Sequence, residues 1–139
     1  MAFEHPIRVY WEDTDAGGIV FYANYLKFFE RARTEWLRSL GLEQRRISQQ
    51  TGGMFVVSET ALKYHAPARL DDLLIVTADL QRKGAASLVL SQKTLLKSER
   101  TENSDAPLLL CAGTIRIGWV DSRTLTPARI PKTILEVLQ

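Results

Sequence analysis

The fold is decided by residues 24–40, NYLKFFERARTEWLRSL, in a chain of 139 residues. Apolar side chains recur here every three or four positions, as they do along one face of an amphipathic helix. They are Tyr25, Phe28, Phe29, Ala32, Trp36 and Leu40. Gly41 follows directly, and glycine at this place commonly ends a helix because it adopts a left-handed conformation without strain. We therefore predict a helix over residues 24–40 that buries one apolar face.

Strand-like segments lie on both sides of this helix. Before it, residues 7–12 alternate, with Ile7, Val9 and Trp11 on one side, which predicts a half-buried strand. After it come four segments that are rich in branched and aromatic residues. These segments are residues 54–65, 73–82, 86–96 and 108–120. Lys83 and Gly84 predict a tight hairpin turn between two of them.

The order of strand, long helix and then four strands predicts an α+β fold. Four successive strands without intervening helices favour an antiparallel sheet. A sheet wrapped around the single long helix would bury the apolar face of that helix, so we expect this arrangement. Its edge strands would stay unpaired, which favours edge-to-edge dimerisation. We expect a homodimer, or a homotetramer built as a dimer of dimers.

The remaining segments are shorter. Residues 42–53 predict a second, shorter helix or a loop that ends at Gly52 and Gly53. Polar residues 97–107 predict a mobile hairpin tip, and residues 132–138 predict a last helical turn or two. The sequence has no internal repeat and no low-complexity tract, so we predict one domain over residues 1–139.

The composition argues against several classes of protein. The net charge is +2, from 18 basic and 16 acidic residues, and no Lys/Arg stripe marks a nucleic-acid surface. No apolar run approaches the roughly 20 residues that cross a bilayer, and the N-terminus lacks the pattern of a signal peptide. The single cysteine, Cys111, cannot form an internal disulfide. We therefore expect a cytoplasmic protein with no transmembrane segment and no nucleic-acid partner.

Common catalytic motifs are missing from the sequence. It has no G-x-S-x-G serine motif, no H-E-x-x-H zinc pair, no P-loop and no G-x-G-x-x-G. His5 and His65 lie in or beside strand segments, and Cys111 lies in an apolar run, so structural roles are favoured for all three. Their spacing offers no set of metal ligands, and we expect no metal site.

Carboxylates are the remaining candidates for catalysis. Asp13 and Asp15 lie just before the long helix, and Glu30 lies within it. An aspartate near a helix start commonly caps the free backbone N–H groups, and Glu30 can form an ion pair with Arg33. On spacing alone these structural roles are common, and a catalytic role stays open beside them.

The catalytic alternative has a clear physical form. Backbone N–H groups at a helix start can bind a developing oxyanion, and a nearby carboxylate can attack the substrate or activate water. Together they could hydrolyse an activated acyl compound without serine, histidine or metal. Gly17 and Gly18 would let the backbone approach such a substrate closely.

From residue 10 to residue 40 the chain reads YWEDTDAGGIVFYANYLKFFERARTEWLRSL, which resembles the hot-dog-fold acyl-CoA thioesterases. It is most similar to their Tol-Pal-associated branch, which is related to 4-hydroxybenzoyl-CoA thioesterase. YHAPARLDDLL (64–74), KGAASL (83–88) and the P-x-x-I-P of residues 127–131 also match, so the resemblance covers nearly the whole chain. It implies a hot-dog fold and hydrolysis of an acyl-CoA, with no cofactor because coenzyme A is part of the substrate.

The resemblance also implies a set of site residues. The catalytic aspartate of the family falls on Asp15, as nucleophile or general base, and the backbone N–H that binds the oxyanion falls on Tyr22. The turn between them, which would contact the substrate, consists of Gly17, Gly18, Ile19 and Val20. Many members of this branch have histidine where this chain has Tyr22. A backbone N–H survives that difference, whereas an imidazole role in acyl selectivity does not.

Coenzyme A carries phosphate charges, so cations are expected near the mouth of the site. Arg82 and Lys83 resemble the phosphate-contacting region of the family, although a charged hairpin is also an ordinary solvated turn. Arg69 is a weaker candidate for the same role.

The sequence also leaves two alternative functions to consider, a binding or scaffold module and a dehydratase. Relatives in this branch are linked to acyl carrier protein and phospholipid enzymes, which suggests a binding or scaffold module with hydrolysis as a side activity. Asp15 argues against pure scaffolding, because a binder needs no carboxylate at an electrophilic carbonyl. A dehydratase of the same fold generally uses a histidine with its acidic residue, and no histidine lies near this helix start. We expect a thioesterase for short-chain or hydroxyacyl groups, with the acyl group at a subunit interface as in relatives.

Overall fold

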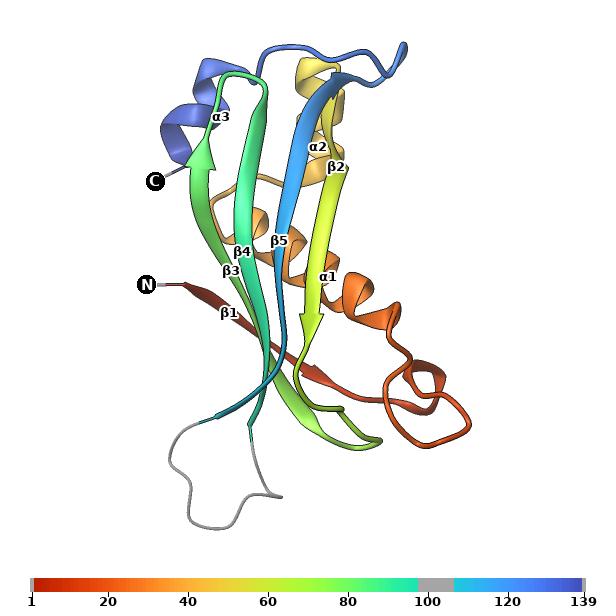
Figure 1. The fold of residues 1–139 in the computed structure, drawn as a ribbon. Coiled ribbons are helices and arrows are strands. Elements are labelled where there is room, and N and C mark those ends of the chain that lie inside the picture. The colour runs from red at the N-terminus through yellow and green to blue at the C-terminus, as the bar shows by residue number, and fades with distance from the viewer. Residues whose placement is uncertain (1, 98–106, 139) are drawn as a thin grey trace.

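The computed structural model describes residues 2–97 and 107–138 (Figure 1). Its strands are β1 (Phe3–Arg8), β2 (Gly53–Tyr64), β3 (Leu73–Lys83), β4 (Ser87–Leu96) and β5 (Leu108–Asp121). Its helices are η1 (Trp11–Asp13, a 3-10 turn), α1 (Asn24–Ser39), α2 (Gln44–Thr51) and α3 (Lys132–Val137). The hairpin tip predicted over residues 97–107 lies almost entirely outside the described residues. Within the described ranges, no helix has the length and apolar character needed to span a membrane.

The strands form one antiparallel sheet in the order β1-β3-β4-β5-β2. This arrangement confirms the predicted α+β class. The four strands predicted after the long helix begin and end within one residue of β2, β3, β4 and β5. The hairpin turn between β3 and β4 differs slightly from its prediction, because Lys83 still pairs with Leu88 and the turn occupies residues 84–86.

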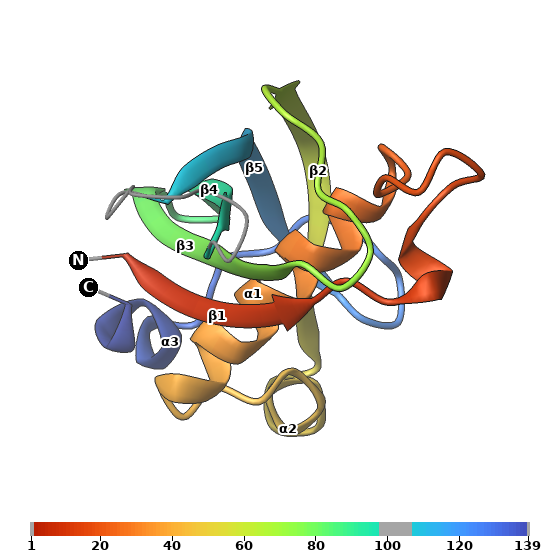
Figure 2. The same cartoon turned by 90° about the horizontal axis from the view of Figure 1, so that it is seen from below.

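Helix α1 lies against one face of the sheet and contacts β1, β3 and β4 (Figure 1, Figure 2). Its buried side chains are Tyr25, Phe28, Phe29, Ala32, Arg33, Trp36 and Leu37. Gly41 has a φ of 81° and donates its N–H to Arg38 O at 2.9 Å, while Leu42 N–H bonds to Leu37 O at 2.8 Å. These two bonds are the Schellman motif that closes many helices. The helix predicted over residues 24–40 is therefore confirmed, including its glycine stop.

The first strand is displaced from its prediction over residues 7–12. β1 ends at Arg8, and the Trp11 side chain is 82% exposed instead of half-buried. The chain turns here because Asp13 Oδ2 accepts a hydrogen bond from Tyr10 N–H at 2.9 Å. A short polar side chain that bonds to a nearby backbone N–H competes with strand pairing. The predicted strand therefore overlaps β1 only at Ile7 and Arg8, although Val9 is fully buried as the alternation predicts.

The two edges of the sheet differ in character. In β1, Pro6 lies opposite Ile75, and proline has no N–H to offer a further strand. β2 pairs with β5 on one side, and on its other side none of the described strands pairs with it. Residues 57–61 of β2 are exposed. The β2 edge is therefore the one that can accept another strand.

One buried polar network ties α1 to the sheet. Gln92 in β4 is fully buried, and its Nε2 donates to Phe29 O and Thr77 O, both at 3.0 Å. Its Oε1 accepts a hydrogen bond from Arg33 Nη1 at 3.0 Å. Burial lowers the pKa of the Arg33 guanidinium, and the negative charge of Glu30 acts in the opposite direction. The Gln92 amide thus gives the buried Arg33 guanidinium an acceptor and makes further bonds to two backbone carbonyls.

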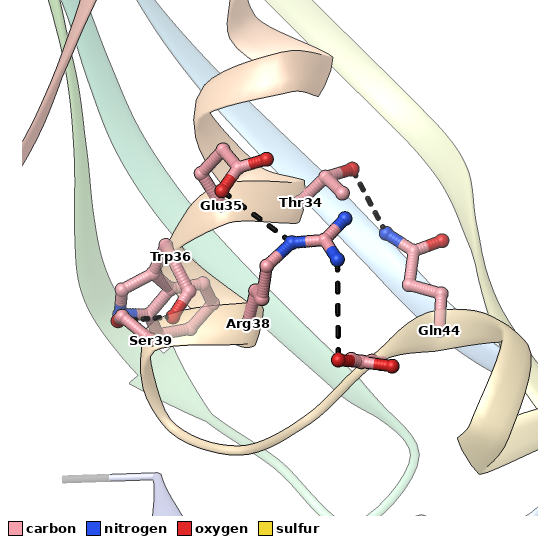
Figure 3. Close-up of polar contacts among 7 residues, drawn as sticks. Thr34, Glu35, Trp36, Arg38, Ser39 and Gln44 are labelled. Carbon is pink, nitrogen blue, oxygen red and sulfur yellow. Dashed lines mark hydrogen bonds and ion pairs between the residues drawn. The ribbon is translucent and has the colours of Figure 1, made fainter.

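Polar contacts also join α1 to α2, the second short helix that residues 42–53 predicted (Figure 3). Arg38 lies between Glu35 and Glu43, with nitrogen-to-oxygen distances of 3.4 and 4.0 Å. Gln44 Nε2 donates to Thr34 Oγ1 at 3.2 Å. These groups are exposed or half-buried, so each contact adds little stability and mainly orients α2.

Replacing Gln92 with leucine should destabilise the fold. The leucine side chain fills a similar volume but leaves Arg33 and two backbone carbonyls without their partner, at a cost of about 3 kcal/mol in the free energy of unfolding. Urea denaturation measures this loss. The double variant Arg33→Met with Gln92→Leu removes the stranded charge and should recover part of it, whereas Gln81→Leu, at an exposed position of β3, serves as the matched control. A Gln92→Leu protein as stable as the wild type would contradict this role of the network.

Cys111 in β5 is fully buried, as its apolar neighbours predicted, and burial raises the pKa of its thiol to about 11. At pH 8 only about one thiol in a thousand is then ionised, and the thiolate is the reactive form. The native protein should therefore react with Ellman's reagent far more slowly than the urea-unfolded protein. Cys111→Ser provides the blank, and rapid reaction of the folded protein at pH 8 would contradict the burial.

Candidate active site

The segment that carries Asp15 and Tyr22 is a loop between η1 and α1, formed by residues 14–22 and here called the aspartate loop. It packs on residues 65–72, the connection between β2 and β3. Val20 N–H donates to Ala68 O at 2.9 Å, and Leu70 N–H donates to Gly18 O at 3.4 Å. Ile19 and Arg69 form an isolated antiparallel bridge. The aspartate loop is thus held in place by backbone contacts with a second loop.

Asp15 lies at the tip of the aspartate loop and is exposed. Its Oδ1 accepts a hydrogen bond from Gly17 N–H at 2.8 Å, and its carbonyl accepts one from Gly18 N–H at 3.0 Å. Gly18 has a φ of 79°, a conformation that glycine adopts without strain. The bridge between Thr14 and Val20 closes the loop behind the turn. The turn fixes one carboxylate oxygen of Asp15 and leaves the side chain accessible.

Neither aspartate caps α1. The helix has no side-chain cap at its N-terminus, where Ala23 is the capping residue. Asp13 is buried and bonds instead to Tyr10 N–H. The capping role that spacing alone favoured is therefore wrong for Asp13 and for Asp15, because each carboxylate satisfies a turn that precedes the helix.

Tyr22 lies in the last turn of chain before α1. Phe21 N–H donates to Asp13 O at 3.0 Å, and Asn24 N–H donates to Phe21 O at 2.8 Å. Between these bonds, the N–H of Tyr22 has no acceptor among the described residues. Because the N-terminal end of a helix carries a partial positive charge, an open N–H at this place favours an anionic oxygen.

A pocket of about 350 Å³ has Tyr22 in its wall. It is lined by Ile19, Val20, Tyr22, Tyr25, Tyr64, His65, Ala66 and Pro67. Three of these residues were predicted to contact substrate, and the other five were not. The signal for four of the five was present in YHAPARLDDLL, residues 64–74, which matched the family but was assigned no role in contacting the acyl group. His65, expected to be structural, is exposed at the wall of the pocket.

Tyrosine rings form one wall of the pocket. Tyr64 Oη donates to Tyr22 O at 2.9 Å, and the rings of Tyr22 and Tyr25 lie 6.3 and 5.6 Å from that of Tyr64. Tyr25 is buried, and its hydroxyl accepts a hydrogen bond from Ala68 N–H at 3.2 Å. Burial raises the pKa of both Tyr25 and Tyr64, so both hydroxyls stay protonated at neutral pH.

The other candidates lie away from the aspartate loop, with the exception of Arg69. Glu30 is on the exposed side of α1 and forms no ion pair with Arg33 or any other described residue. Together with Arg33 it lines a groove of about 460 Å³ between α1 and β2. Arg69 is exposed beside Ile19. Among these three residues, only Arg69 adjoins the aspartate loop.

Arg82 and Lys83 lie at the far end of β3. The strand begins at Leu73, opposite Arg8 and close to the aspartate loop, and its ten steps to Lys83 span about 33 Å. Lys83 Nζ donates to the carbonyls of Leu135 and Leu138, at 3.1 and 2.8 Å, and so binds the C-terminal end of α3. Within one subunit the fold does not bring these two cations to Asp15.

Comparisons with known proteins agree with this architecture. Residues 17–102 match the model of the thioesterase superfamily. The acyl-CoA thioesterase YbgC of Haemophilus influenzae is 38% identical over 132 residues, which cover 95% of this chain and 90% of that protein. The acyl-CoA thioester hydrolase YbgC of Escherichia coli O157:H7 is 38% identical over 133 residues, covering 96% and 92%.

Solved structures show the same fold. A probable thioesterase from Bartonella henselae superposes with a TM-score of 0.82 at 28% identity, covering 94% of this chain and all of that one. A mutant of 4-hydroxybenzoyl CoA thioesterase, complexed with 4-hydroxybenzoyl CoA, gives a TM-score of 0.88 over 99% of both chains. At 18% identity, the similarity to this second structure indicates a shared fold and nothing further. The chain belongs to the thioesterase superfamily, as its resemblance to the hot-dog-fold acyl-CoA thioesterases indicated.

Proposed function

We propose that this protein hydrolyses acyl-CoA thioesters to coenzyme A and a free acid. The observation that carries the proposal is the open N–H of Tyr22, a residue that lies just before α1, lines an apolar pocket and shares a loop with Asp15. The two relatives named above are an acyl-CoA thioesterase and an acyl-CoA thioester hydrolase, which supports the same substrate class. In this proposal α1 is the central helix of the hot-dog fold.

The chemistry needs only the groups of the aspartate loop. The thioester carbonyl oxygen accepts a hydrogen bond from Tyr22 N–H, and its negative charge grows as the carbon becomes tetrahedral. As a nucleophile, Asp15 would form a mixed anhydride and release the CoA thiolate, and water would then cleave the anhydride. As a general base, Asp15 would take a proton from the water that attacks the carbonyl. Both routes consume one water and require no cofactor beyond the coenzyme A of the substrate.

The pocket supports a short-chain or hydroxyacyl substrate. Its volume of about 350 Å³ is small, and its walls combine aliphatic side chains with tyrosine rings. Gly17, Gly18, Ile19 and Val20 would line the path of the thioester. Tyr22 presents a phenol at this wall, so acyl selectivity here should differ from that of relatives with histidine at this place.

Arg82 and Lys83 enter the proposal as contacts for the phosphates of coenzyme A. Because they lie about 33 Å along β3 from the aspartate loop, they would serve a substrate whose acyl group lies in another subunit. Coenzyme A thioesters and acyl carrier protein are both cytoplasmic acyl carriers, and we propose the cytoplasm as the site of action.

The proposed assembly is a homodimer formed at the β2 edge, from which a homotetramer can be built. Exposed Val57 and Thr60 of β2 face a groove that also contains Glu30 and Arg33 of α1. A two-fold axis through this groove would pair like surfaces and could bring Glu30 of each subunit toward Arg33 of the other. Such contact would supply the carboxylate that the buried guanidinium lacks.

Val57→Arg should prevent this assembly. The added charge enters the groove beside Arg33 and Lys27, so two copies would repel each other. Sedimentation velocity at micromolar concentration should show a folded monomer, whereas the wild type sediments as a dimer or tetramer. Gln81→Arg, on an exposed position of β3, is the control and should keep the wild-type mass. A wild-type monomer, or an unchanged Val57→Arg oligomer, would contradict the proposed interface.

Asp15→Asn should lower kcat by at least about 100-fold, because the amide is neither a nucleophile nor a base. Release of free thiol from a panel of acyl-CoA esters, from acetyl to palmitoyl and including hydroxyacyl and benzoyl esters, measures this effect. Glu12→Gln, which neutralises an exposed carboxylate three residues away, is the matched control and should stay within about two-fold of wild type.

Two results of this experiment would overturn parts of the proposal. Unchanged turnover in Asp15→Asn would remove Asp15 from catalysis. A wild type that hydrolyses no ester of the panel would favour a binding or scaffold module, and the same panel with acyl carrier protein thioesters tests that partner directly.

A further inference from the structure

Tyr64 makes a hydrogen bond at the pocket that the proposed chemistry does not use. It is the last residue of β2 and lies 42 positions along the chain from Tyr22, yet its hydroxyl donates to Tyr22 O at 2.9 Å. Its side chain is 49% exposed, so the bond does not simply satisfy a buried group. We therefore look for the reason for this bond, which joins the sheet to the start of α1, in the proposed site.

The reason lies in the backbone of Tyr22. The peptide group that carries the Tyr22 N–H also carries Phe21 O, which accepts a hydrogen bond from Asn24 N–H at 2.8 Å. The next peptide group carries Tyr22 O and precedes the helical residues, so no intrahelical bond fixes it within the described chain. Tyr64 Oη is its partner. The peptide group that contains the Tyr22 N–H and the one that follows it are therefore both held by hydrogen bonds. The Tyr22 N–H thus has a defined direction.

The ring of Tyr64 is itself held in place. It meets the Tyr22 ring edge to face at 84° and the Tyr25 ring at 64°. Tyr25 bonds to Ala68 N–H, and Ala68 O in turn accepts the N–H of Val20 from the aspartate loop. Tyr25 therefore connects this cluster, through Ala68, to Val20 of the aspartate loop. Tyr64 connects the same cluster to the backbone carbonyl of Tyr22.

We propose that Tyr64 is a positioning residue of the thioesterase reaction, whose hydroxyl holds the Tyr22 carbonyl, and so the peptide group next to the one that carries the Tyr22 N–H, in an orientation that points this N–H at the thioester oxygen. The inference rests on the proposed function, since it presumes that this N–H binds the oxyanion. A donor that is already oriented before the reaction stabilises the transition state without further reorganisation. Loss of the Tyr64 hydroxyl should therefore affect the transition state more than the bound substrate.

Tyr64→Phe tests the proposal, because it keeps the ring and its contacts and removes only the hydroxyl. We expect kcat on the best ester of the panel to fall about 10-fold while KM stays within about two-fold, since one neutral hydrogen bond is lost. The midpoint of thermal unfolding should change little because Tyr64 is about half exposed. Tyr10→Phe, at an exposed tyrosine outside the pocket, is the matched control and should keep the wild-type kcat.

The outcomes separate this proposal from the function on which it rests. If Asp15→Asn loses activity but Tyr64→Phe keeps the wild-type kcat, the thioesterase assignment stands and the positioning role is wrong. A rise in KM with unchanged kcat would make Tyr64 a wall of the pocket only, and would also overturn the proposal. A non-hydrolysable thioether analogue of the ester, titrated calorimetrically, should bind wild type and Tyr64→Phe equally, because it lacks the carbonyl oxygen.

Discussion

The structure depends on burying the aromatic face of α1 against the sheet. Phe28 and Phe29 are fully buried there, and the burial of two such rings contributes several kcal/mol to folding. The contact between α1 and the sheet is mostly apolar. It also contains one buried polar interaction, the hydrogen bond from Arg33 of α1 to Gln92 of β4. That interaction favours one register of α1 on β4, since a shift by one helical residue would break the bonds of Gln92 to the Arg33 guanidinium, Phe29 O and Thr77 O. The position of the helix start, and so of Tyr22, follows from this register.

Much of this architecture was predictable from local patterns. The helix of residues 24–40 and four of the strands have strong periodicity, bounded by glycine or polar residues, and their ends agree with the structure closely. The failure near residue 11 is instructive, because the pattern of alternation continued there while the backbone did not. The carboxylate of Asp13 took the N–H of Tyr10, and hydrophobic periodicity contains no information about such a bond.

The candidate site was predictable to a smaller extent. Asp15 and Tyr22 were named through a resemblance, while spacing alone favoured a helix cap that the structure does not contain. Tyr25 and Tyr64 could not be connected to the site from sequence, because the pocket forms where α1, the end of β2 and two loops meet. Contacts between segments about 40 residues apart depend on the strand order, and the order β1-β3-β4-β5-β2 does not follow from alternation. The groove at Glu30 and Arg33 was missed for the same reason.

Pro6 has a consequence for how many copies of the chain can join. A sheet with two usable edges could add subunits at both ends and grow into an open filament. Here β1 presents a residue without an N–H, while β2 has an exposed edge. Strand addition is therefore favoured at β2, and two sheets that meet at their β2 edges leave no further edge of the same kind. A single proline thus makes the β1 edge the poorer of the two for adding a strand, because it removes one backbone donor there.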